Sequence, residues 1–330
     1  MPQQWAVAAD GGHMANPPLS KKLRHATQPF MKARQFTRPI DAFGKSRGDR
    51  VDFDKVSNVQ TQGGKLQETV KMPVTKFQIV KDTLIVDEYG NSVDYTGKLE
   101  TIAEFNINNP VQKALRDDMA KVLDKAVIDE LKLTRTKVIG DSASSIVWDT
   151  DGTPSTTALS NLTVFHVKEI VDGMKTGDFG TQGTNDFNPV MPFTGPDGDY
   201  VALMSVKARR GISDDPEWEE WTKYTKADML MKGEVGRLYG CKVVETNHTA
   251  ALLNSIASNV TGEALFFGDD PIVEGIAIPE ELRGKIPGDY GRDKGVAWYF
   301  LGGWKLTWRT STTPATDLIR ESHVIHWTSQ

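Results

Sequence analysis

The chain has 330 residues, of which 38% are hydrophobic and 25% charged, and it carries a formal net charge of −5. This length exceeds what one compact domain usually contains, and the ordinary composition argues against global disorder and a fibrous repeat. The acidic balance does not favour a protein whose main task is to bind nucleic acid, although it allows a local basic face. No apolar run approaches the ~20 residues that span a bilayer, and the N-terminus lacks the pattern of a secretory signal. We therefore expect a soluble protein made in the cytoplasm.

The single cysteine, Cys241, restricts the covalent chemistry of the chain. An intramolecular disulfide is impossible, and a zinc site built on cysteines is strongly disfavoured. Cys241 begins the β-branched run CKVVET, which favours a small buried side chain over a reactive thiol.

Residues 1–48 have no clean hydrophobic period and mix prolines and glycines with basic side chains. This composition is typical of an extended arm. Because free arms are usually poorly ordered, we expect this one to be held by the body of the same chain or by a neighbouring chain.

Residues 49–105 are predicted to form an extended β-hairpin. The run RVDFDKV alternates, and the stretches TVKMPVTKFQIV and DTLIVDEY are rich in residues that favour strands. The triplet YGN at 89–91 indicates a turn, after which SVDYTGK returns. A lone hairpin is only marginally stable in water, so we expect this one to project and to pack against something else.

The strongest helical pattern lies within residues 106–140, in INNPVQKALRDDMAKVLDKAVIDELKL. Asn109 is a suitable N-cap, and Pro110 suits the first helical position. We predict a rod about 30 Å long over 110–131, with most charged residues, Asp124 among them, off its apolar stripe. The stripe consists of Leu115, Met119, Val122, Leu123, Ala126 and Leu131.

Residues 141–330 are expected to form a mixed domain. Helices are predicted over 162–174 and in DDPEWEEWTKYTKADML. Strands are predicted at DYVALMSV, CKVVET, EALFFG, VAWYFLGGWKLTWRT and LIRESHVIHWTS. Strands and helices do not alternate regularly, which indicates an α+β class and not a doubly wound parallel sheet.

Motifs that could carry chemistry are weak. DTDG at 149–152 begins like a calcium loop but lacks the third acidic ligand and the closing glutamate, so a turn is expected. The histidines of HVIH at 323–326 should point to opposite faces of a strand, and His166 with Glu169 is predicted to be a surface pair. No nucleophile elbow, phosphate loop or HExxH motif is present. We expect no catalytic residue, no metal site and no cofactor.

The stretch MLMKGEVGRLYGCKVVETN contains Gly233, Gly236 and Gly240 in the spacing GxxGxxxG. A phosphate-binding loop follows a strand and opens a helix, whereas here a helical segment precedes the glycines and β-branched residues follow them. The three residues are therefore predicted to be structural turn glycines, which allow backbone angles closed to other residues.

This glycine stretch, with YVALMSVKARRGISDDPEW before it and EALFFGDDPIVEGI after it, resembles the second half of tailed-phage major capsid proteins. The matching positions are 200–204, Gly233, Gly236, Gly240, Val243, Val244 and 264–268. The order of the earlier segments agrees, so the resemblance covers roughly residues 30–330. It implies the α+β Hong Kong 97-type major capsid fold. The expected parts are an N-terminal arm (1–48), an extended β-hairpin or E-loop (49–105), a spine helix with the start of the peripheral domain (106–140), and a mixed α/β axial domain with returning peripheral-domain strands (141–330).

The resemblance implies a non-enzymatic major capsid protein of the virion. Such a protein assembles itself, as hexamers and pentamers, into the icosahedral head shell around the double-stranded DNA genome of a tailed bacteriophage. The expected partners are further copies of the chain, a portal, cement or decoration proteins, and packaged DNA touched non-specifically on the inner face. Some members carry a cleaved scaffolding segment for which this chain has no room, so a separate scaffolding protein is expected. Candidate interface residues are Arg24, Lys32, Arg34, Lys65, Lys71, Lys76, Lys81 and Tyr89.

Three other functions stay open from the residues alone. An encapsulin-like nanocompartment uses the same fold around enzyme cargo, and the nature of the contents would distinguish it. A hydrolase built on the loops at 140–200 lacks any pattern of nucleophile and base. A nucleic-acid-binding module using the basic arm is disfavoured by the acidic total.

Overall fold

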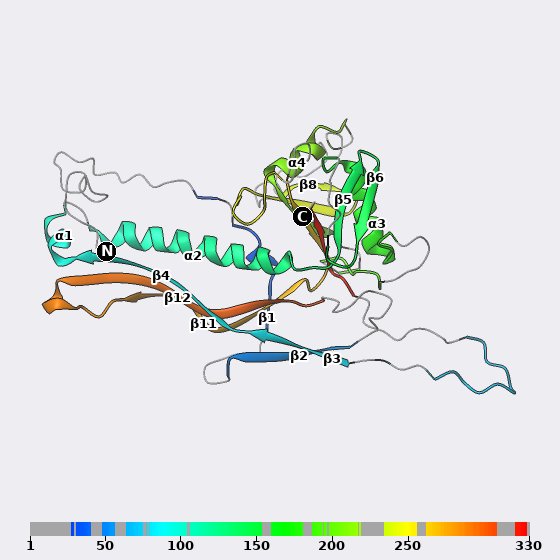
Figure 1. Cartoon of the computed structure of the whole chain (residues 1–330), viewed down its shortest axis with the longest axis horizontal. Helices are drawn as coiled ribbons and strands as arrows, with labels where there is room; N and C mark the ends of the chain where they lie inside the picture. Colours follow the sequence, from blue (N-terminus) through cyan, green and yellow to red (C-terminus); the bar gives the residue numbers. More distant parts are fainter. Residues whose placement is uncertain are drawn as a thin grey trace.

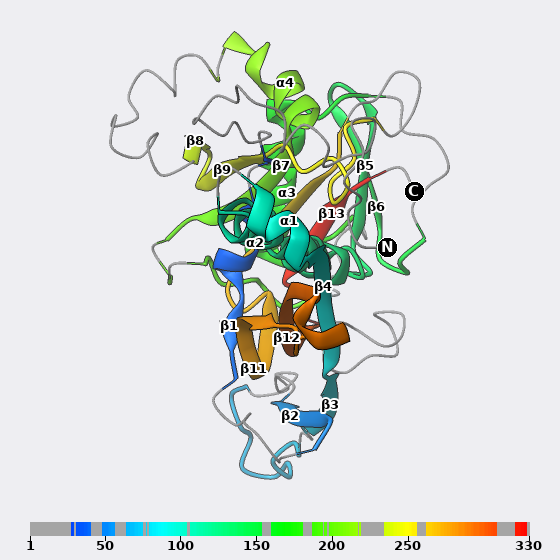
Figure 2. The ribbon, with the colours of Figure 1, turned by 90° about the vertical axis from the view of Figure 1, so that its left-hand side faces the viewer.

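The chain folds into a long slab joined at one end to a rounder lobe (Figure 1). The computed structural model describes residues 28–29, 31–40, 48–56, 64–74, 77, 79–103, 106–153, 160–180, 187–193, 195–196, 198–216, 218, 234–255, 262–308 and 321–328. In the slab, one long helix covers a four-stranded sheet, and a two-stranded hairpin lies on the opposite side of that sheet (Figures 1 and 2).

The slab contains the sheet with strand order β1-β11-β12-β4 and the separate pair β2-β3. Its strands are β1 (Arg38–Pro39), β2 (Arg50–Val56), β3 (Ile79–Ile85), β4 (Asp87–Thr96), β11 (Ile272–Gly284) and β12 (Asp293–Leu306). Its helices are η2 (Arg34–Phe36), α1 (Gly97–Ile102), α2 (Asn108–Leu131) and η3 (Asp289–Gly291).

The lobe contains a mixed seven-stranded sheet in the order β6-β5-β13-β10-β7-β9-β8. Its strands are β5 (Lys137–Ser142), β6 (Ser145–Asp149), β7 (Tyr200–Ser205), β8 (Glu234–Leu238), β9 (Cys241–Thr246), β10 (Ala264–Phe267) and β13 (Val324–Trp327). Its helices are α3 (Val164–Thr176) and α4 (Val206–Ser213). None of the helices described is both long and apolar enough to cross a membrane.

The spine helix α2 forms where the sequence predicts it and lies along the four-stranded sheet (Figure 1). It has 24 residues, which corresponds to about 36 Å at 1.5 Å per residue. Leu115, Leu123 and Leu131 of its apolar stripe are buried in the same cluster as Trp298 and Phe300 of β12. The predicted stripe is therefore the face that the helix buries.

The start of α2 differs from the prediction. The helix begins at Asn108, and Ile107 occupies the N-cap position without a side-chain cap. Asn109 lies inside the first turn, so its assignment as the cap is wrong. The backbone amide of Asn108 instead donates a hydrogen bond to the side-chain oxygen Oδ1 of Asn106, at 3.0 Å.

The turn predicted at 89–91 is absent, and this prediction is wrong. β4 runs unbroken through the triplet and pairs antiparallel with β12 along 87–96. An added Cβ on Gly90 would come within 2.9 Å of the Trp298 carbonyl oxygen. Glycine here permits the close approach of two strands, which is a common reason for a glycine inside a strand.

The β2–β3 hairpin pairs antiparallel, from Arg50 opposite Ile85 to Val56 opposite Ile79. Its first strand matches the prediction for RVDFDKV. The prediction of strand structure for TVKMPVTKFQIV is wrong at 69–74, where the chain is not in a strand. The described parts of the range 49–105 are thus divided among this hairpin, strand β4 of the four-stranded sheet and helix α1.

The seven-stranded sheet is buried on both faces. Along β7, Ala202 and Met204 join a core with Ile170 of α3, whereas Val201 and Leu203 join the core that also contains α2. Successive side chains of a strand point to opposite faces, so the continuous apolar run of β7 reflects a strand that is covered on both sides.

Helix α3 is capped at both ends by groups that lie close in sequence. The amide of Thr163 donates to Nδ1 of His166 at 3.0 Å, and Gly177 ends the helix in the left-handed conformation with φ of 76°. His166 is fully buried, and burial lowers its pKa. The prediction that His166 and Glu169 form a surface pair is therefore wrong.

A cluster of buried and half-buried titratable side chains joins the C-terminal end of the spine helix to the lobe. The ammonium of Lys132 lies 2.5 Å from Oε2 of Glu263, and Nε2 of His326 lies 3.4 Å from Oε1 of the same carboxylate. Lys137 donates to Nδ1 of His326 at 3.0 Å. We call Lys132, Lys137, Glu263 and His326 the junction cluster.

The two histidines of HVIH do not share one strand. His323 precedes β13 and contacts the carbonyl oxygen of Asp269 and the carboxylate of Glu321, whereas His326 lies within β13. They have different partners, and the expectation of a single strand holding both is wrong.

Candidate subunit interface

The β2–β3 hairpin exposes large apolar side chains to solvent. It lies on the outer side of the four-stranded sheet, away from α2 (Figures 1 and 2). Eight side chains in it are between 54% and 78% exposed, and we call them the apolar row: Val56, Leu66, Val70, Met72, Val74, Phe77, Ile79 and Ile85. Many apolar side chains exposed on one projecting segment favour a surface that a partner covers.

The base of the hairpin is attached to the chain's own slab. Leu84 of β3 is fully buried and fits over two glycines, because an added Cβ on Gly275 would lie 2.9 Å from it and one on Gly303 would lie 3.4 Å from it. Lys55 is also buried and bonds to Asp82 at 2.7 Å, a contact that joins β2 to β3 within the hairpin. The base therefore holds the hairpin in place, while the apolar row stays open.

The lysines predicted for the interface lie on this hairpin where they are described. Lys65 and Lys71 are exposed, and they line a shallow hollow of about 200 Å³ with Leu66 and Val70. Lys81 is exposed and lies 3.8 Å from Asp52. Lys76 and Arg24 are outside the described residues.

The described end of the N-terminal arm is held by the body of the same chain. Arg34 bonds to Glu274 at 3.0 Å and to Glu280 at 2.8 Å, both on β11. β1 adds to the edge of β11 as a parallel strand, and Lys32 just before η2 is half-buried. We expected the arm to be held either by the body of the same chain or by a neighbouring chain. Residues 31–40 are held by the body of the same chain.

Asp124 is a residue of this anchor that sequence reasoning missed. The carboxylate is 2% exposed and accepts a hydrogen bond from the amide of Ala33 at 2.8 Å. Its second oxygen lies 3.3 Å from Nδ1 of His248, in the loop after β9. The placement of Asp124 off the buried stripe is therefore wrong. An aspartate in a polar stretch of helix gives no local signal that a backbone amide 91 residues away will donate a hydrogen bond to it.

Tyr89 packs within its own chain. It lies on β4, with its ring 5.6 Å from that of Trp304 and 6.1 Å from that of Phe300. Burial raises the pKa of its hydroxyl. The side chain is half-buried, so any contact with a neighbouring copy would use only its exposed part.

Gly240 has the role predicted for a turn glycine. Tyr239 and Gly240 join β8 to β9 with φ of 50° and 77°. Two positive φ values are the pattern of a two-residue type I′ hairpin turn. Gly233 lies outside the described residues.

Gly236 is not a turn glycine, and that prediction is wrong. It lies within β8, and an added Cβ would come within 2.8 Å of the indole ring of Trp218. The residue makes room for a ring that is 5% exposed. No helix follows it, since β8 turns directly into β9, which excludes the strand–loop–helix order of a phosphate-binding loop at this point.

The other predicted motifs are structural. DTDG forms a bend after β6, in which the amide of Asp151 donates to Oδ1 of Asp149 at 3.2 Å. Cys241 is fully buried, and burial raises the pKa of its thiol. Within the described parts of the chain, no three side chains of His, Cys, Asp or Glu are grouped to hold a metal ion.

The sequence itself matches no family model and no curated protein. The fold, in contrast, is similar to solved structures over almost its full length. The capsid of Ralstonia phage GP4 gives a TM-score of 0.67 at 16% identity, covering 98% of both chains. The head structure of Helicobacter pylori bacteriophage KHP40 gives 0.68 at 12% identity, covering 96% of both.

The acid-stable capsid structure of Helicobacter pylori bacteriophage KHP30 gives a TM-score of 0.67 at 13% identity, covering 94% of this chain and 95% of that one. Identities this low show a shared fold. The α+β fold of the Hong Kong 97 type, as it occurs in tailed-phage capsids, is therefore confirmed for this chain.

Proposed function

We propose that this chain is a major capsid protein that assembles into the icosahedral head shell around the double-stranded DNA genome of a tailed bacteriophage. The observation that carries the proposal is the likeness to phage capsid and head structures over 94–98% of the chain. The matched length includes the arm, the hairpin, the spine helix and the lobe. The likeness is therefore not confined to a core that many unrelated folds share.

The apolar row supports assembly through copies of the same chain. Burying one such side chain fully stabilises a contact by about 1.5–3 kcal/mol. The row lies on a hairpin that extends from the slab, with a base fixed by Leu84, which packs against Gly275 and Gly303 of the slab. In the proposed shell, the row lies across an adjacent subunit, and Lys65, Lys71 and Lys81 lie at the margin of that contact.

The remaining partners follow from the same proposal. The subunits group as hexamers and pentamers, in the virion, with a separate scaffolding protein and a portal during assembly and with DNA touched non-specifically on the inner face. Cement or decoration proteins would bind the outer face. The role is structural and not enzymatic, in keeping with neighbours that are capsids.

A nanocompartment shell of the same fold is the second candidate. The phage capsids reported above favour the virion over this alternative. Nuclease-protected DNA inside assembled particles would support the phage head, and a protein cargo would support the compartment.

The test of assembly is light scattering together with negative-stain electron microscopy on the full chain, over a range of concentrations and with the scaffolding protein if one is identified. We expect pentamers, hexamers or closed shells. A stable monomer under every condition would overturn the proposal.

The double variant Val74→Ser, Phe77→Ser tests the apolar row within the same assay. These side chains are 78% and 59% exposed, so we expect an unchanged circular dichroism spectrum and a loss of assembly. Leu133→Ser is the matched control, because Leu133 is also exposed, at 45%, but follows the end of α2. Equal assembly of double variant and wild type would exclude the row as an interface.

A further inference from the structure

One exposed stretch of the hairpin has the sequence of a strand but no strand partner. Residues 70–74, VKMPV, place apolar side chains at every second position, and those of Val70, Met72 and Val74 are 60%, 64% and 78% exposed. Residues 71–74 belong to no strand within the part of the chain that the structure describes. A period of two without a partner strand is the pattern of a segment that completes a sheet elsewhere. We call residues 70–74 the pairing segment.

Strand β4 forms one edge of the four-stranded sheet. It pairs with β12 in one continuous register over 87–96, and it has no second neighbour among the described strands. All of residues 87–92 except Tyr89 are exposed, and β4 contains neither a proline nor a bulge. A long and regular edge of this kind is a template on which another chain can pair.

The opposite edge of the same sheet is protected. β11 contains Pro279 and two irregularities of register, one between Ile276 and Ile278 and one between Ile278 and Glu281. The short strand β1 covers the beginning of β11. Prolines, bulges and covering segments are common devices that keep an edge strand from pairing. β4 has none of them, so it is the edge of the slab that can accept a further strand.

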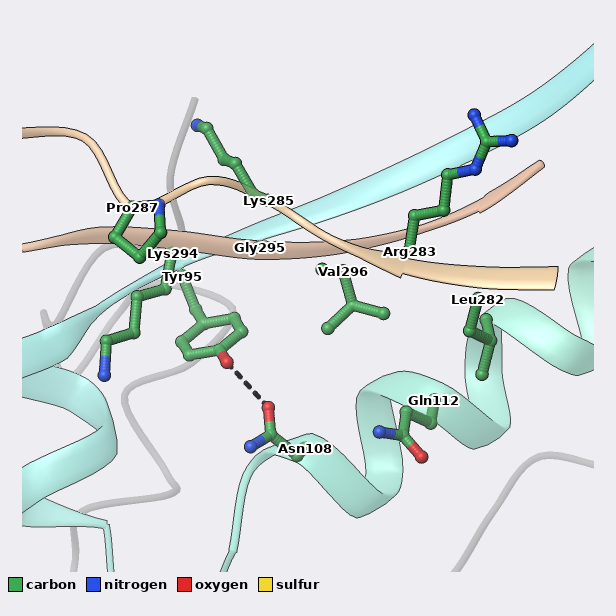
Figure 3. A pocket seen from close by; sticks show the side chains of 11 residues that line it. Tyr95, Asn108, Gln112, Leu282, Arg283, Lys285, Pro287, Lys294, Gly295 and Val296 are labelled. Atoms are coloured by element: carbon green, nitrogen blue, oxygen red, sulfur yellow. Dashed lines mark hydrogen bonds between the residues drawn. The ribbon is translucent and has the colours of Figure 1, made fainter. Parts of the chain in front are cut away.

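The second half of β4 is engaged within the chain. Tyr95 is buried and points toward the start of α2, where its hydroxyl donates to the side-chain oxygen of Asn108 at 2.6 Å, beside a pocket of about 300 Å³ (Figure 3). The ammonium of Lys285 lies 2.9 Å from the carboxylate of Asp94. The carboxylate at this end of β4 is therefore already paired with a cation. We call residues 87–92, which precede this part, the open edge.

The pairing segment and the open edge carry opposite charges that are not yet paired. Lys71 is exposed in the first, and Asp87 and Glu88 are exposed in the second. None of these three side chains takes part in an ion pair among the described residues. Residues 70–77 contain two lysines and no acid, whereas β4 contains three acids and no lysine or arginine. Opposite charges on adjacent strands stabilise their pairing.

We propose that the pairing segment of one copy of the chain adds as an edge strand to the open edge of β4 in a neighbouring copy. Tyr89 of β4 packs on the face of α2, whereas Glu88 lies on the opposite face, where it accepts a hydrogen bond from Tyr299 at 3.1 Å. Because the side chains of a strand alternate between faces, the apolar positions of the pairing segment cover Tyr89 while Lys71 lies on the face of Glu88. An added edge strand tolerates Pro73 when its nitrogen points away from β4.

The pairing segment does not serve the β4 of its own chain. Between them runs β3, which is fixed to β2 over seven paired residues, about 23 Å of strand. The pairing segment lies at the far end of the hairpin, and β4 runs in the other direction along the slab (Figure 1). The inference rests on the proposed shell, which supplies the neighbouring copy.

Photo-cross-linking tests the contact. Met72, which is 64% exposed, is replaced by p-benzoylphenylalanine, and the variant chain is assembled with wild-type chain carrying nitrogen-15. We expect cross-links to the labelled tryptic peptide 82–98, located within residues 87–92 by fragmentation. The same amino acid at Val147, which is 37% exposed on β6, is the control and should not reach this peptide.

Cross-links from position 72 only to other labelled peptides, or only within the same chain, would overturn the contact. This inference and the proposed function fail separately. Assembled particles without the cross-link to the open edge contradict the inference and leave the capsid function standing, whereas failure of the wild type to assemble contradicts the capsid function.

Reversal of charge gives an independent readout. Lys71→Glu and Glu88→Lys should each raise the concentration at half-assembly by about threefold or more, because like charges on adjacent strands are destabilising. The double variant restores opposite charges and should return to within about twofold of wild type. Lys207→Glu on α4 is the control, since Lys207 is equally exposed and should not restore assembly when combined with Glu88→Lys.

All of these variants should keep the circular dichroism spectrum of the wild type, because each exchanged side chain is exposed. A double variant that assembles no better than the single variants would contradict the pairing of Lys71 with Glu88. Rescue by Lys207→Glu as well would show that assembly follows net charge and not this contact, which would also contradict the proposal.

Discussion

At the scale of single residues, the slab and lobe depend on side chains, and on glycines that leave room for a neighbour, whose partners lie far away in the sequence. Asp124 holds the amide of Ala33, and Gly236 makes room for Trp218. Gly240 differs from Gly236, because it supplies a positive φ and has open space around it. The two glycines therefore respond differently to the same substitution.

We expect Gly236→Ala to destabilise the free subunit more than Gly240→Ala. At Gly240 an alanine meets no atom within 4 Å but is strained by φ of 77°, which costs about 1–2 kcal/mol. At Gly236 the new methyl group would lie 2.8 Å from a buried indole, and overpacking of this kind costs about 1–3 kcal/mol. Urea unfolding measures both. Gly64→Ala, with neither constraint, is the control and should be neutral.

Asp124→Ala should release the arm. The substitution leaves the amide of Ala33 buried without its acceptor, which costs about 1–3 kcal/mol. Hydrogen exchange at Ala33 should become faster, and urea unfolding should shift to lower concentration. Asp129→Ala is the control on the same helix, because its side chain is 49% exposed and pairs with the exposed Lys125. Unchanged exchange at Ala33 in the Asp124 variant would show that the arm is held mainly by β1 and Arg34.

At the scale of elements, the hairpin and the spine helix represent opposite ways to stabilise a segment. α2 buries one stripe along its own sheet. Among its described residues, the hairpin buries Leu84 and Val51 at its base and the side chain of Lys55, whereas residues 64–74 are exposed throughout. A segment with few buried contacts opens locally at little cost, so this element should respond most strongly to assembly.

Limited trypsin digestion should cut free subunits first at Lys65 and Lys71, which are exposed on the hairpin. In assembled shells, the same sites should be protected, because the proposed contact covers the hairpin. Lys132 is the internal control: its side chain is 21% exposed and bonded to Glu263, so it should resist cleavage in both states. Equal resistance of the hairpin lysines in free subunits would show that they are protected by their own chain.

At the scale of the whole molecule, slab and lobe share an apolar core, to which α2 and the strands β7, β10 and β13 contribute, and they are joined further by polar contacts at the end of the helix. The junction cluster lies where α2 leads into β5, and it binds the helix end to β10 and β13 through Glu263 and His326. Burial lowers the pKa of His326 to about 4. Burial opposes ionisation of Glu263, but the His326 ring and the Lys132 ammonium outweigh it and lower its pKa to about 2.

The cluster predicts a loss of stability in acid. Between pH 6.5 and about 4, an unfolded chain protonates this histidine while the folded chain keeps it neutral, so the free energy of unfolding falls as pH falls. Between pH 4.5 and about 2, the unfolded glutamate takes up a proton that folded Glu263 does not, which lowers stability further.

Urea unfolding between pH 7 and 4 measures this effect. His326→Gln should remove up to one proton from the linkage, a slope of about 1.4 kcal/mol per pH unit. The comparison of slopes is independent of any overall loss of stability in the variant. An identical slope in variant and wild type would show that His326 does not carry the pH dependence.

The sequence by itself determined the elements whose signals are local. The helical period predicted α2, the β-rich runs predicted β2, β7, β9, β10 and β12, and the irregular order of the elements indicated the α+β class. Gly240 was identifiable because a tight turn between two strands requires a positive φ at that residue itself. These features follow from interactions between residues a few positions apart.

Only the tertiary structure decided the features whose cause lies elsewhere in the chain. The triplet at 89–91 has the composition of a turn, yet β12 extends it as a strand, because pairing with a neighbour outweighs local preference. The sequence predicts Asp124 to be a surface charge, whereas in the structure it accepts a hydrogen bond from the buried amide of Ala33 in the arm. The apolar row likewise appears only when the chain is folded, since exposure is a property of packing and not of composition.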